Sequence, residues 1–314
     1  MASRYVNRAF TILQKHLKEN AFKNKVLAKE TTMRIGGPAD IFAVTDSFDH
    51  LNIVLRTAKE WGIPLFIIGK GSNLLISDSG FPGIVLRLGR DFMIKKVNGA
   101  KIQAGAAVSL PSLVQTASKY ALSGLCFAIG IPGSLGGSLI MNAGAHGNCI
   151  GDVVKRVLIY SRDCEFKILE KDQLNFEYRK GSFSRDDIIV EATLVLSPGE
   201  PDNIKRQMED YFTKRKDSQP LQFPTAGSVF KNPSNDSAGR LIEGAGCKGM
   251  RVGDAEVSVK HANFIINRGK ATASDVYALL SEVQRRVFEH YGVILEPEVE
   301  FLGEFDEALL KNKT

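Results

Sequence analysis

The chain has 314 residues, of which 44% are hydrophobic and 24% charged, and it carries a formal net charge of +6. These values are typical of globular proteins and exclude a disordered or fibrous chain. At roughly 150 residues per domain, the length predicts two or three domains.

No apolar run approaches the roughly 18 residues that a membrane span needs, and residues 1–20 lack the apolar stretch of a signal peptide. We therefore expect a cytoplasmic protein without a membrane partner. The four cysteines are scattered and form no C-x-x-C pair, which predicts reduced, mostly buried thiols.

The positive net charge permits an anionic partner, either a nucleic acid or a small phosphorylated ligand. The densest cationic run is KRK at 214–216, and no aromatic residues alternate with it as a stacking surface for bases would require. We interpret this run as a solvated helix end and expect no nucleic-acid partner.

Residues 41–69 have the pattern strand, helix, strand, with apolar residues at helical spacing between Leu51 and Trp61. Asp46 and Ser47 are candidate N-caps, while Gly62 and Pro64 end the helix. A right-handed parallel crossover places the loop at residue 69 at the carboxyl end of a buried strand, where α/β sheets bind ligands.

Further strands are expected at 84–88 and 101–104, followed by a helix over 110–121 that ends at Gly124. Residues 124–147 are rich in glycine, which lets a backbone approach a ligand closely. Apolar residues alternate over 188–196 and predict a half-buried strand.

The sequence SPGEP at 197–201 is the best boundary signal, and a helix follows over 202–215. The last hundred residues predict turns over 225–253, a strand near Phe264, a helix from Val276 to Tyr291 and a final strand. The predicted fold is α+β, a mixed α/β chain. Its expected parts are residues 1–90, residues 91–200 and a C-terminal α+β domain, 201–314.

The common nucleotide motifs are absent. The loop GKGSNL at 69–74 has Leu74 where a dinucleotide fingerprint needs its third glycine, and no G-x-x-x-x-G-K-[ST] occurs. Backbone amides with the Ser72 hydroxyl and the Asn73 amide form either an anion-binding nest or a plain tight turn. A second glycine loop, GIPGSLGG at 130–137, favours a large ligand that carries a diphosphate.

The two loops and their surroundings resemble the flavin-binding fold of vanillyl-alcohol-oxidase-type flavoproteins. This resemblance implies that 1–90 and 91–200 form a two-part FAD-binding region and that 201–314 form a substrate-binding domain. Within that group, the chain is similar to the UDP-N-acetylenolpyruvoylglucosamine reductase (MurB) family over nearly its whole length. The stretches that carry the resemblance are TTMRIGGPAD at 31–40, GKGSNLLI at 69–76, GIPGSLGGSLIMNAGAHG at 130–147, FEYRKGSF at 176–183, PTAGSVFKNP at 224–233, AGRLIEGAGCKG at 238–249, VSVKHANFIINRG at 257–269 and LEPEVEFLG at 295–303.

The resemblance implies non-covalent FAD, NADPH as co-substrate, and reduction of an enolpyruvyl ether on a UDP-amino-sugar during peptidoglycan precursor synthesis and cell-wall biogenesis. The implied cofactor residues are Arg34, Gly69, Lys70, Gly71, Ser72, Asn73, Leu74, Gly130, Ile131, Pro132, Gly133, Gly136, Gly137, Asn142, Ala143 and Gly144. The implied contacts to substrate or nicotinamide nucleotide are Tyr178, Lys231, Asn232, Arg240 and Lys248.

Three residues match catalytic positions of the family. Arg179 matches the arginine that faces the substrate carboxylate, Ser228 the proton donor, and Glu298 the glutamate that stabilises the enol intermediate. Taken alone, each has a plainer interpretation: a surface charge beside Lys180, a hydrogen-bonding turn serine, and one of three glutamates on an edge-strand face.

The chain departs from one form of the family, which carries an extra tyrosine loop over the substrate after the EYR motif. No tyrosine occurs between Tyr178 and Tyr211, so the chain resembles the shorter form, which leaves open how water is excluded from the site. His146 and His261 have no second histidine at metal-ligand spacing, and we expect hydrogen-bonding scaffold roles and no metal. The resemblance implies a monomer or weak homodimer.

Two alternatives remain. One is another FAD-dependent oxidase of the same broad fold, acting on a small alcohol or sugar and often carrying covalent flavin. Residues 66–83 contain neither histidine nor cysteine as the usual attachment point, which disfavours it. The other is a non-enzymatic nucleotide-binding protein.

Overall fold

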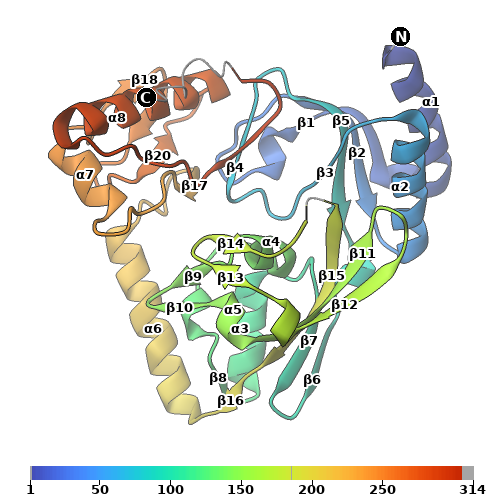
Figure 1. The fold of residues 1–314 in the computed structure, drawn as a ribbon, viewed down its shortest axis with the longest axis horizontal. Helices are drawn as coiled ribbons and strands as arrows, with labels where there is room; N and C mark the ends of the chain where they lie inside the picture. The colour runs from blue at the N-terminus through green and yellow to red at the C-terminus, as the bar shows by residue number, and fades with distance from the viewer. Residues whose placement is uncertain (1, 185, 306–314) are drawn as a thin grey trace. The chain divides into compact units, whose positions relative to one another are not determined.

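The computed structural model describes residues 2–184 and 186–305, which form a mixture of helices and strands in two compact units (Figure 1). Unit 1 comprises Met1–Lys23, Ile41–Lys70 and Gly83–Arg215, and unit 2 comprises Asn24–Asp40, Gly71–Pro82 and Lys216–Thr314. The predicted mixed α+β class is confirmed, whereas the division at residues 90 and 200 stays a prediction. Within the part of the chain that is described, no helix is both long and apolar enough to cross a bilayer.

A four-stranded sheet, most of it in unit 1, has the order β1 (Ala21–Val26), β2 (Pro38–Thr45), β5 (Phe81–Leu88), β3 (Leu65–Ile67). Strands β3 and β5 are parallel, and α1 (Ala2–Leu17) and α2 (Phe48–Trp61) pack side by side (Figure 1). The helix predicted between the first two strands of residues 41–69 is confirmed as α2. The Ser47 hydroxyl accepts a bond from the His50 amide, and Gly62 closes the helix in the left-handed conformation. Asp46 instead accepts a bond from the Arg90 amide.

The second sheet of unit 1 is antiparallel, with the order β12 (Phe166–Glu170), β11 (Val154–Ser161), β15 (Asp187–Val195), β7 (Lys101–Gly105), β6 (Lys95–Asn98). Strand β15 is its centre, and neighbouring Ile188 and Ile189 are 1% and 4% exposed. The predicted apolar face is confirmed as buried, but the second face is more covered than expected, because Ile189 and Thr193 are buried while Val195 is exposed. On this second face, Arg156 of the paired strand β11 donates to the Thr193 hydroxyl.

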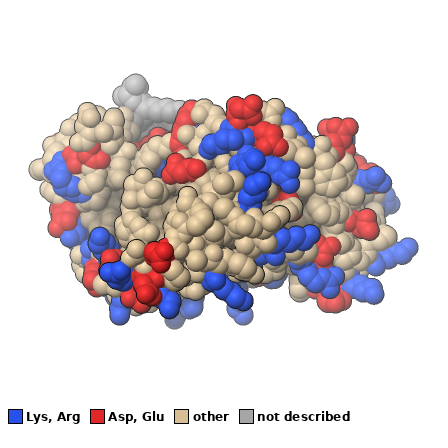
Figure 2. All heavy atoms as spheres, turned by 90° about the horizontal axis from the view of Figure 1, so that it is seen from below, with Lys and Arg blue, Asp and Glu red and all other residues tan. Residues whose placement is uncertain are grey.

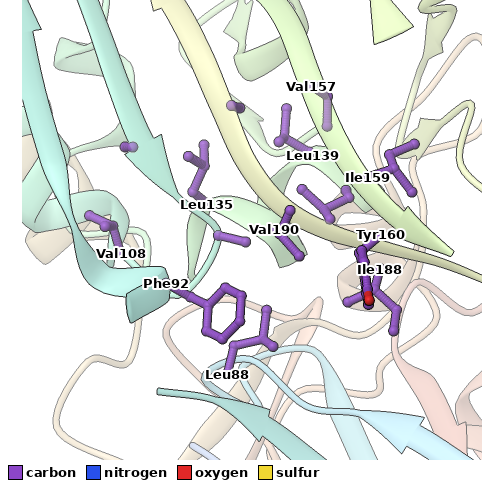
Figure 3. Packing of buried hydrophobic residues seen from close by; sticks show 14 of the residues in the cluster. Leu88, Phe92, Val108, Leu135, Leu139, Val157, Ile159, Tyr160, Ile188 and Val190 are labelled. Atoms are coloured by element: carbon purple, nitrogen blue, oxygen red, sulfur yellow. The ribbon is translucent and has the colours of Figure 1, made fainter. Parts of the chain in front are cut away.

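Apolar side chains on one side of this sheet form part of the unit 1 core. Figure 3 shows Val190 and Ile188 of β15 close to Phe92, Leu135 and Tyr160. Helix α3 (Leu110–Lys119) packs into the same core and ends earlier than expected. Tyr120 caps it and Ala121 turns the chain with a φ of 51°, so Gly124 does not end the helix.

Unit 1 also contains short elements around its loops. These are η1 (Lys18–Asn20), η3 (Arg90–Met93), β8 (Leu122–Ser123), η4 (Cys126–Ala128), α4 (Leu135–Ile140), β9 (Gly144–Ala145), β10 (Asn148–Cys149), α5 (Ile150–Val153), η5 (Lys171–Gln173), β13 (Phe176–Glu177), β14 (Lys180–Gly181) and β16 (Ser197–Pro198). The long helix α6 (Pro201–Ser218) begins directly after the predicted boundary.

Unit 2 is built on a sheet with the order β17 (Thr225–Ser228), β20 (Phe264–Asn267), β19 (Ala255–Val257), β18 (Arg251–Val252). It also contains η2 (Leu27–Glu30), α7 (Ala238–Gly244), α8 (Ala273–Tyr291), and the parallel pair β4 (Leu74–Ile76) and β21 (Glu300–Leu302). Its buried core joins side chains from β19 and α8 to Met33, Ile35 and Leu75 from the two early segments.

The helix predicted from Val276 to Tyr291 is confirmed as α8. Thr272 and Asp275 form a capping box at its start, and Gly292 ends it with a φ of 67°. The Asp78 carboxylate accepts further bonds from the Ala273 and Ser274 amides, so a residue far away in sequence satisfies the first turn.

The surface carries charges of both signs. On the face shown in Figure 2, basic side chains lie among acidic ones. The excess of positive charge is thus interspersed with carboxylates on that face.

Candidate functional site

The first glycine loop follows β3, and its Gly69 packs against the second loop within unit 1. A Cβ atom added to Gly69 would lie 2.5 Å from the Ser134 hydroxyl oxygen, closer than atoms of that kind approach. Ser134 is buried and caps α4 through a bond from the Gly137 amide. Gly69 is therefore required where the two loops meet.

The second glycine loop is fixed by main-chain hydrogen bonds to residues 105–110. The Gly133 carbonyl accepts from the Leu110 amide at 2.9 Å, and the Gly136 amide donates to the Ala106 carbonyl at 2.9 Å. A Cβ on Gly136 would lie 3.0 Å from that of Ala106. Pro132 and Gly137 remain exposed, so the anchored loop presents backbone to solvent.

The segment 142–144 and the β13–β14 hairpin meet in unit 1. The buried Asn142 donates to the Glu177 carbonyl at 2.9 Å and accepts from the Gly151 amide at 3.1 Å. Arg179 lies in the hairpin turn with a φ of 58°, and its guanidinium donates to the Gly144 carbonyl at 3.3 Å. One predicted catalytic residue thus contacts a predicted cofactor residue.

Ser228 and Glu298 lie on neighbouring segments of unit 2. Ser228 ends β17 and pairs with Phe264, and the next residue, Val229, accepts a bond from the Glu298 amide at 2.9 Å. The Lys231 amide donates to the Glu296 carbonyl at 2.8 Å. Residues 228–231 therefore run beside 296–298 through main-chain bonds, and both predicted catalytic side chains are partly exposed.

Two asparagines support this arrangement. The buried Asn263 accepts from the Phe230 amide at 3.0 Å and donates to the Phe230 carbonyl at 2.8 Å. Asn73, in the part of the first loop that belongs to unit 2, donates to the Glu298 carbonyl at 2.9 Å. Asn73 was predicted as a cofactor residue. Asn263 was not predicted, because the sequence does not show that its side chain is buried and bonds to the backbone of Phe230.

The remaining first-loop residues in unit 2 differ in exposure. Gly71 is buried, and a Cβ there would lie 2.3 Å from the Glu30 carbonyl oxygen. Ser72 is partly exposed and Leu74 is buried in β4. Arg34 is exposed and has a φ of 57°.

Predicted substrate residues with positive charge have carboxylate partners. Lys231 pairs with Glu296, and Lys248 pairs with Glu243 at 2.7 Å. Arg240 forms a two-pronged contact with Asp236 that lowers the pKa of this carboxyl group to about 2. A ligand anion would have to compete with these acids or share the cations with them.

The uncharged predicted substrate residues are both exposed but differ in their contacts. Asn232 accepts from the Ala238 amide at 3.0 Å, and Tyr178 is exposed with its ring beneath the Arg179 guanidinium.

The predicted catalytic trio is divided between the units. Arg179 belongs to unit 1, while Ser228 and Glu298 belong to unit 2. The structure brings together the latter two, and the convergence of all three stays a prediction.

The two motif histidines and the cysteines occupy ordinary positions. His261 accepts a bond from the Asn263 amide, as a scaffold residue does, and burial lowers its pKa. The His146 ring instead stacks on Tyr211 at 4.0 Å. Cys126 and Cys247 are buried free thiols, and Cys149 and Cys164 are partly exposed. Among residues 2–184 and 186–305, no group of His, Cys, Asp and Glu is placed to hold a metal ion.

Comparison with known proteins identifies the family. Residues 219–302 match the C-terminal domain of UDP-N-acetylenolpyruvoylglucosamine reductase, and residues 39–167 match an FAD binding domain. The reductase of Desulforamulus reducens is 45% identical over 93% of this chain and 97% of its own length. The chain belongs to the UDP-N-acetylenolpyruvoylglucosamine reductase family.

Two further reductases support this family assignment. The reductase of Moorella thermoacetica is 46% identical over 93% of this chain and 96% of its own length. The crystal structure of the Thermus caldophilus reductase covers 89% of this chain and 98% of its own, with 37% identity and a TM-score of 0.79. The predicted family is therefore confirmed.

The family assignment gives the loops a ligand. Both glycine loops fall inside the FAD-binding domain, 39–167, and Ser228 and Glu298 fall inside the C-terminal domain, 219–302. Arg179 lies between the two matched segments. The backbone exposed at Gly137 fits a cofactor whose phosphates approach main-chain amides closely.

Proposed function

We propose that this chain reduces UDP-N-acetylglucosamine enolpyruvate to UDP-N-acetylmuramate with NADPH, in peptidoglycan precursor synthesis. Family membership supports the reaction. The observation that carries the assignment of residues is the main-chain pairing of 228–231 with 296–298, because it places Ser228 and Glu298 close together in the C-terminal domain.

FAD, when bound, would supply hydride chemistry between NADPH and the terminal carbon of the enolpyruvyl group. We propose that the loops that begin at Gly69 and Gly130, together with Arg34 and residues 142–144, hold it. The loops bind through backbone amides, because glycine leaves these amides accessible to phosphate oxygens.

Hydride addition leaves negative charge on the neighbouring substrate carbon and its carboxylate. Arg179 is proposed to face this carboxylate, since a planar guanidinium donates two parallel hydrogen bonds and stays charged. Removing one such preorganised donor typically costs about 3–4 kcal/mol of transition-state stabilisation.

Ser228 is proposed to transfer a proton from its Oγ to the substrate carbon that carries the charge. A hydroxyl is a weak acid, so the acceptor must be strongly basic, as a carbanion-like centre is. Glu298, as a protonated carboxyl group, is proposed to donate a hydrogen bond to the enol intermediate.

The other contacts are proposed from the family match. Tyr178, Lys231 and Asn232 contact substrate or nicotinamide nucleotide, and Arg240 and Lys248 bind the substrate diphosphate. We further propose a cytoplasmic location and a monomer or weak homodimer.

The decisive experiment is anaerobic. The FAD-loaded protein is reduced with NADPH and then mixed with UDP-N-acetylglucosamine enolpyruvate, and the visible absorbance of the oxidised flavin is followed. Return of the absorbance with formation of UDP-N-acetylmuramate is expected. A flavin that stays bleached would refute the proposed function, and a flavin that remains attached after denaturation would favour the oxidase alternative.

A further inference from the structure

The last turn of α6 places Arg215 against the start of the second glycine loop, within unit 1. A Cβ on Gly130 would lie 3.1 Å from Cδ of Arg215 and 3.5 Å from its Nε. Gly130 has a φ of 76°, a conformation that favours glycine. The arginine stem thus fills the space that a side chain at residue 130 would need. The interpretation of the KRK run as a solvated helix end is wrong for this residue, which is partly buried.

The guanidinium of Arg215 lacks a counterion among the residues that the structure describes. Its Nε is buried without a hydrogen-bond partner, and no carboxylate in that part of the chain forms an ion pair with it. Burial lowers the pKa of the group. Nearly all buried polar atoms in proteins have a partner, so this one calls for an explanation.

Lys214 adds a second positive charge close to Arg215 and His146. Partial desolvation, then the charges of Lys214 and Arg215, lower the pKa of His146, which stacks on Tyr211 of the same helix. The partial negative charge at a helix C-terminus favours an exposed cation there. It does not explain why the Nε is turned inward against Gly130, whereas an anion held by the terminal nitrogens of the guanidinium would fix this orientation.

We propose that Arg215 is a cofactor-binding residue whose guanidinium donates hydrogen bonds to the diphosphate of FAD. The inference rests on the proposed function, which requires FAD. It adds a residue outside both matched segments, 39–167 and 219–302, at a loop that lies inside the FAD-binding domain. Arginine suits this role because its donors match two phosphate oxygens and it stays charged when partly buried.

The experiment measures FAD affinity rather than turnover. Apoprotein is prepared for the wild type, Arg215→Met, Arg215→Lys and the control Arg206→Met, and is titrated with FAD by fluorescence quenching. Arg206 lies on the exposed side of the same helix, bonded to Asn203. Arg215→Met should raise the Kd for FAD about 10- to 100-fold, as loss of a charge-assisted bond does, and Arg215→Lys should raise it less. Arg206→Met should match the wild type.

Two further measurements separate phosphate binding from general damage. Riboflavin, which has no phosphate, should bind wild type and Arg215→Met equally. The melting temperature of the apoprotein should not fall in Arg215→Met, because the variant removes an uncompensated, partly buried charge. Gly130→Ala should also weaken FAD binding, since the new methyl group displaces the arginine stem.

Several results would overturn the inference. These are a Kd for FAD within about twofold of the wild type in Arg215→Met, equal weakening of FAD and riboflavin, or weakened UDP-N-acetylglucosamine binding with FAD affinity unchanged. Failure of the wild-type apoprotein to bind FAD at all would instead refute the proposed function.

Discussion

The Ser228 and Glu298 segments of unit 2 and the Arg179 hairpin of unit 1 hold their side chains in different ways. In unit 2, main-chain bonds join 228–231 to 296–298, and the Asn263 side chain adds two more. Arg179 sits in a two-residue turn, beside an exposed tyrosine, and its guanidinium donates to the Gly144 carbonyl at 3.3 Å. The backbone that carries the proposed proton donor is thus fixed by the sheet, whereas the proposed anion-binding arginine extends from a turn.

The largest expected effect is that of Ser228→Ala. Turnover should fall about 10²- to 10⁴-fold, the range for loss of a general acid. Flavin reduction by NADPH, measured by stopped flow, should stay nearly unchanged because protonation is a later step. Ser228→Cys should retain more activity, and Ser234→Ala, at an exposed serine of the next turn, is the control. Equal loss in both half-reactions would contradict the role of Ser228.

Arg179→Gln tests the hairpin side of the comparison. The rate of flavin reoxidation by substrate should fall about 10²- to 10³-fold, as for loss of one preorganised donor. Stability should change by less than about 0.5 kcal/mol, since the side chain contributes little to the core. Lys180→Gln, at the exposed neighbour, should behave as the wild type. A large loss of stability with intact reoxidation would show that Arg179 is structural.

Asn263→Ala tests whether side-chain support of the backbone matters for chemistry. Loss of both bonds to Phe230 should lower the free energy of unfolding in urea by about 2–4 kcal/mol. Asn267→Ala is a matched control, because Asn263 and Asn267 are each 3% exposed and Asn267 also bonds to backbone. Both variants should lose stability, but only Asn263→Ala should also lower kcat. Equal kcat values in the two folded variants would argue against a positioning role.

The smallest effect concerns pH. The Arg268 guanidinium, 2.7 Å from the Glu256 carboxylate, lowers the pKa of this carboxyl group in β19, two strands from Ser228. Its contribution to stability is complete above the unfolded value of about 4.3 and is lost as pH falls through the lower folded value. Glu256→Gln should therefore flatten the acid side of a plot of melting temperature against pH. An unchanged slope below pH of about 4 would exclude this pair as a source of acid sensitivity.

The fold was predictable where local signals agreed. Helix α2 was found because apolar spacing, an N-cap and a terminal glycine coincide at Ser47 and Gly62, and α8 was found from its apolar spacing alone. Strand β15 was located, but the alternation of apolar residues could not show that Ile189 and Thr193 on its second face are buried as well. The end of α3 was missed because Ala121 adopts a left-handed conformation that is rare for alanine.

The site residues likewise fall into those that the sequence identifies and those that it does not. The glycine loops and the Ser228 and Glu298 stretches carry family motifs and could be identified by resemblance. Asn263 and Arg215 could not, because their roles depend on what lies opposite them in space. A buried amide beside Phe230 and a guanidinium beside Gly130 look in sequence like an ordinary asparagine and a surface charge.

The interleaving of the two units has a consequence for dissection of the chain. The backbone passes from one unit to the other after residues 23, 40, 70, 82 and 215. A fragment that begins at Lys216 would lack Met33, Ile35 and Leu75, which belong to its own apolar interior. We expect such a fragment to fold incorrectly. The two units therefore cannot be expressed separately by a single cut in the chain, and a gene fusion must include the whole polypeptide.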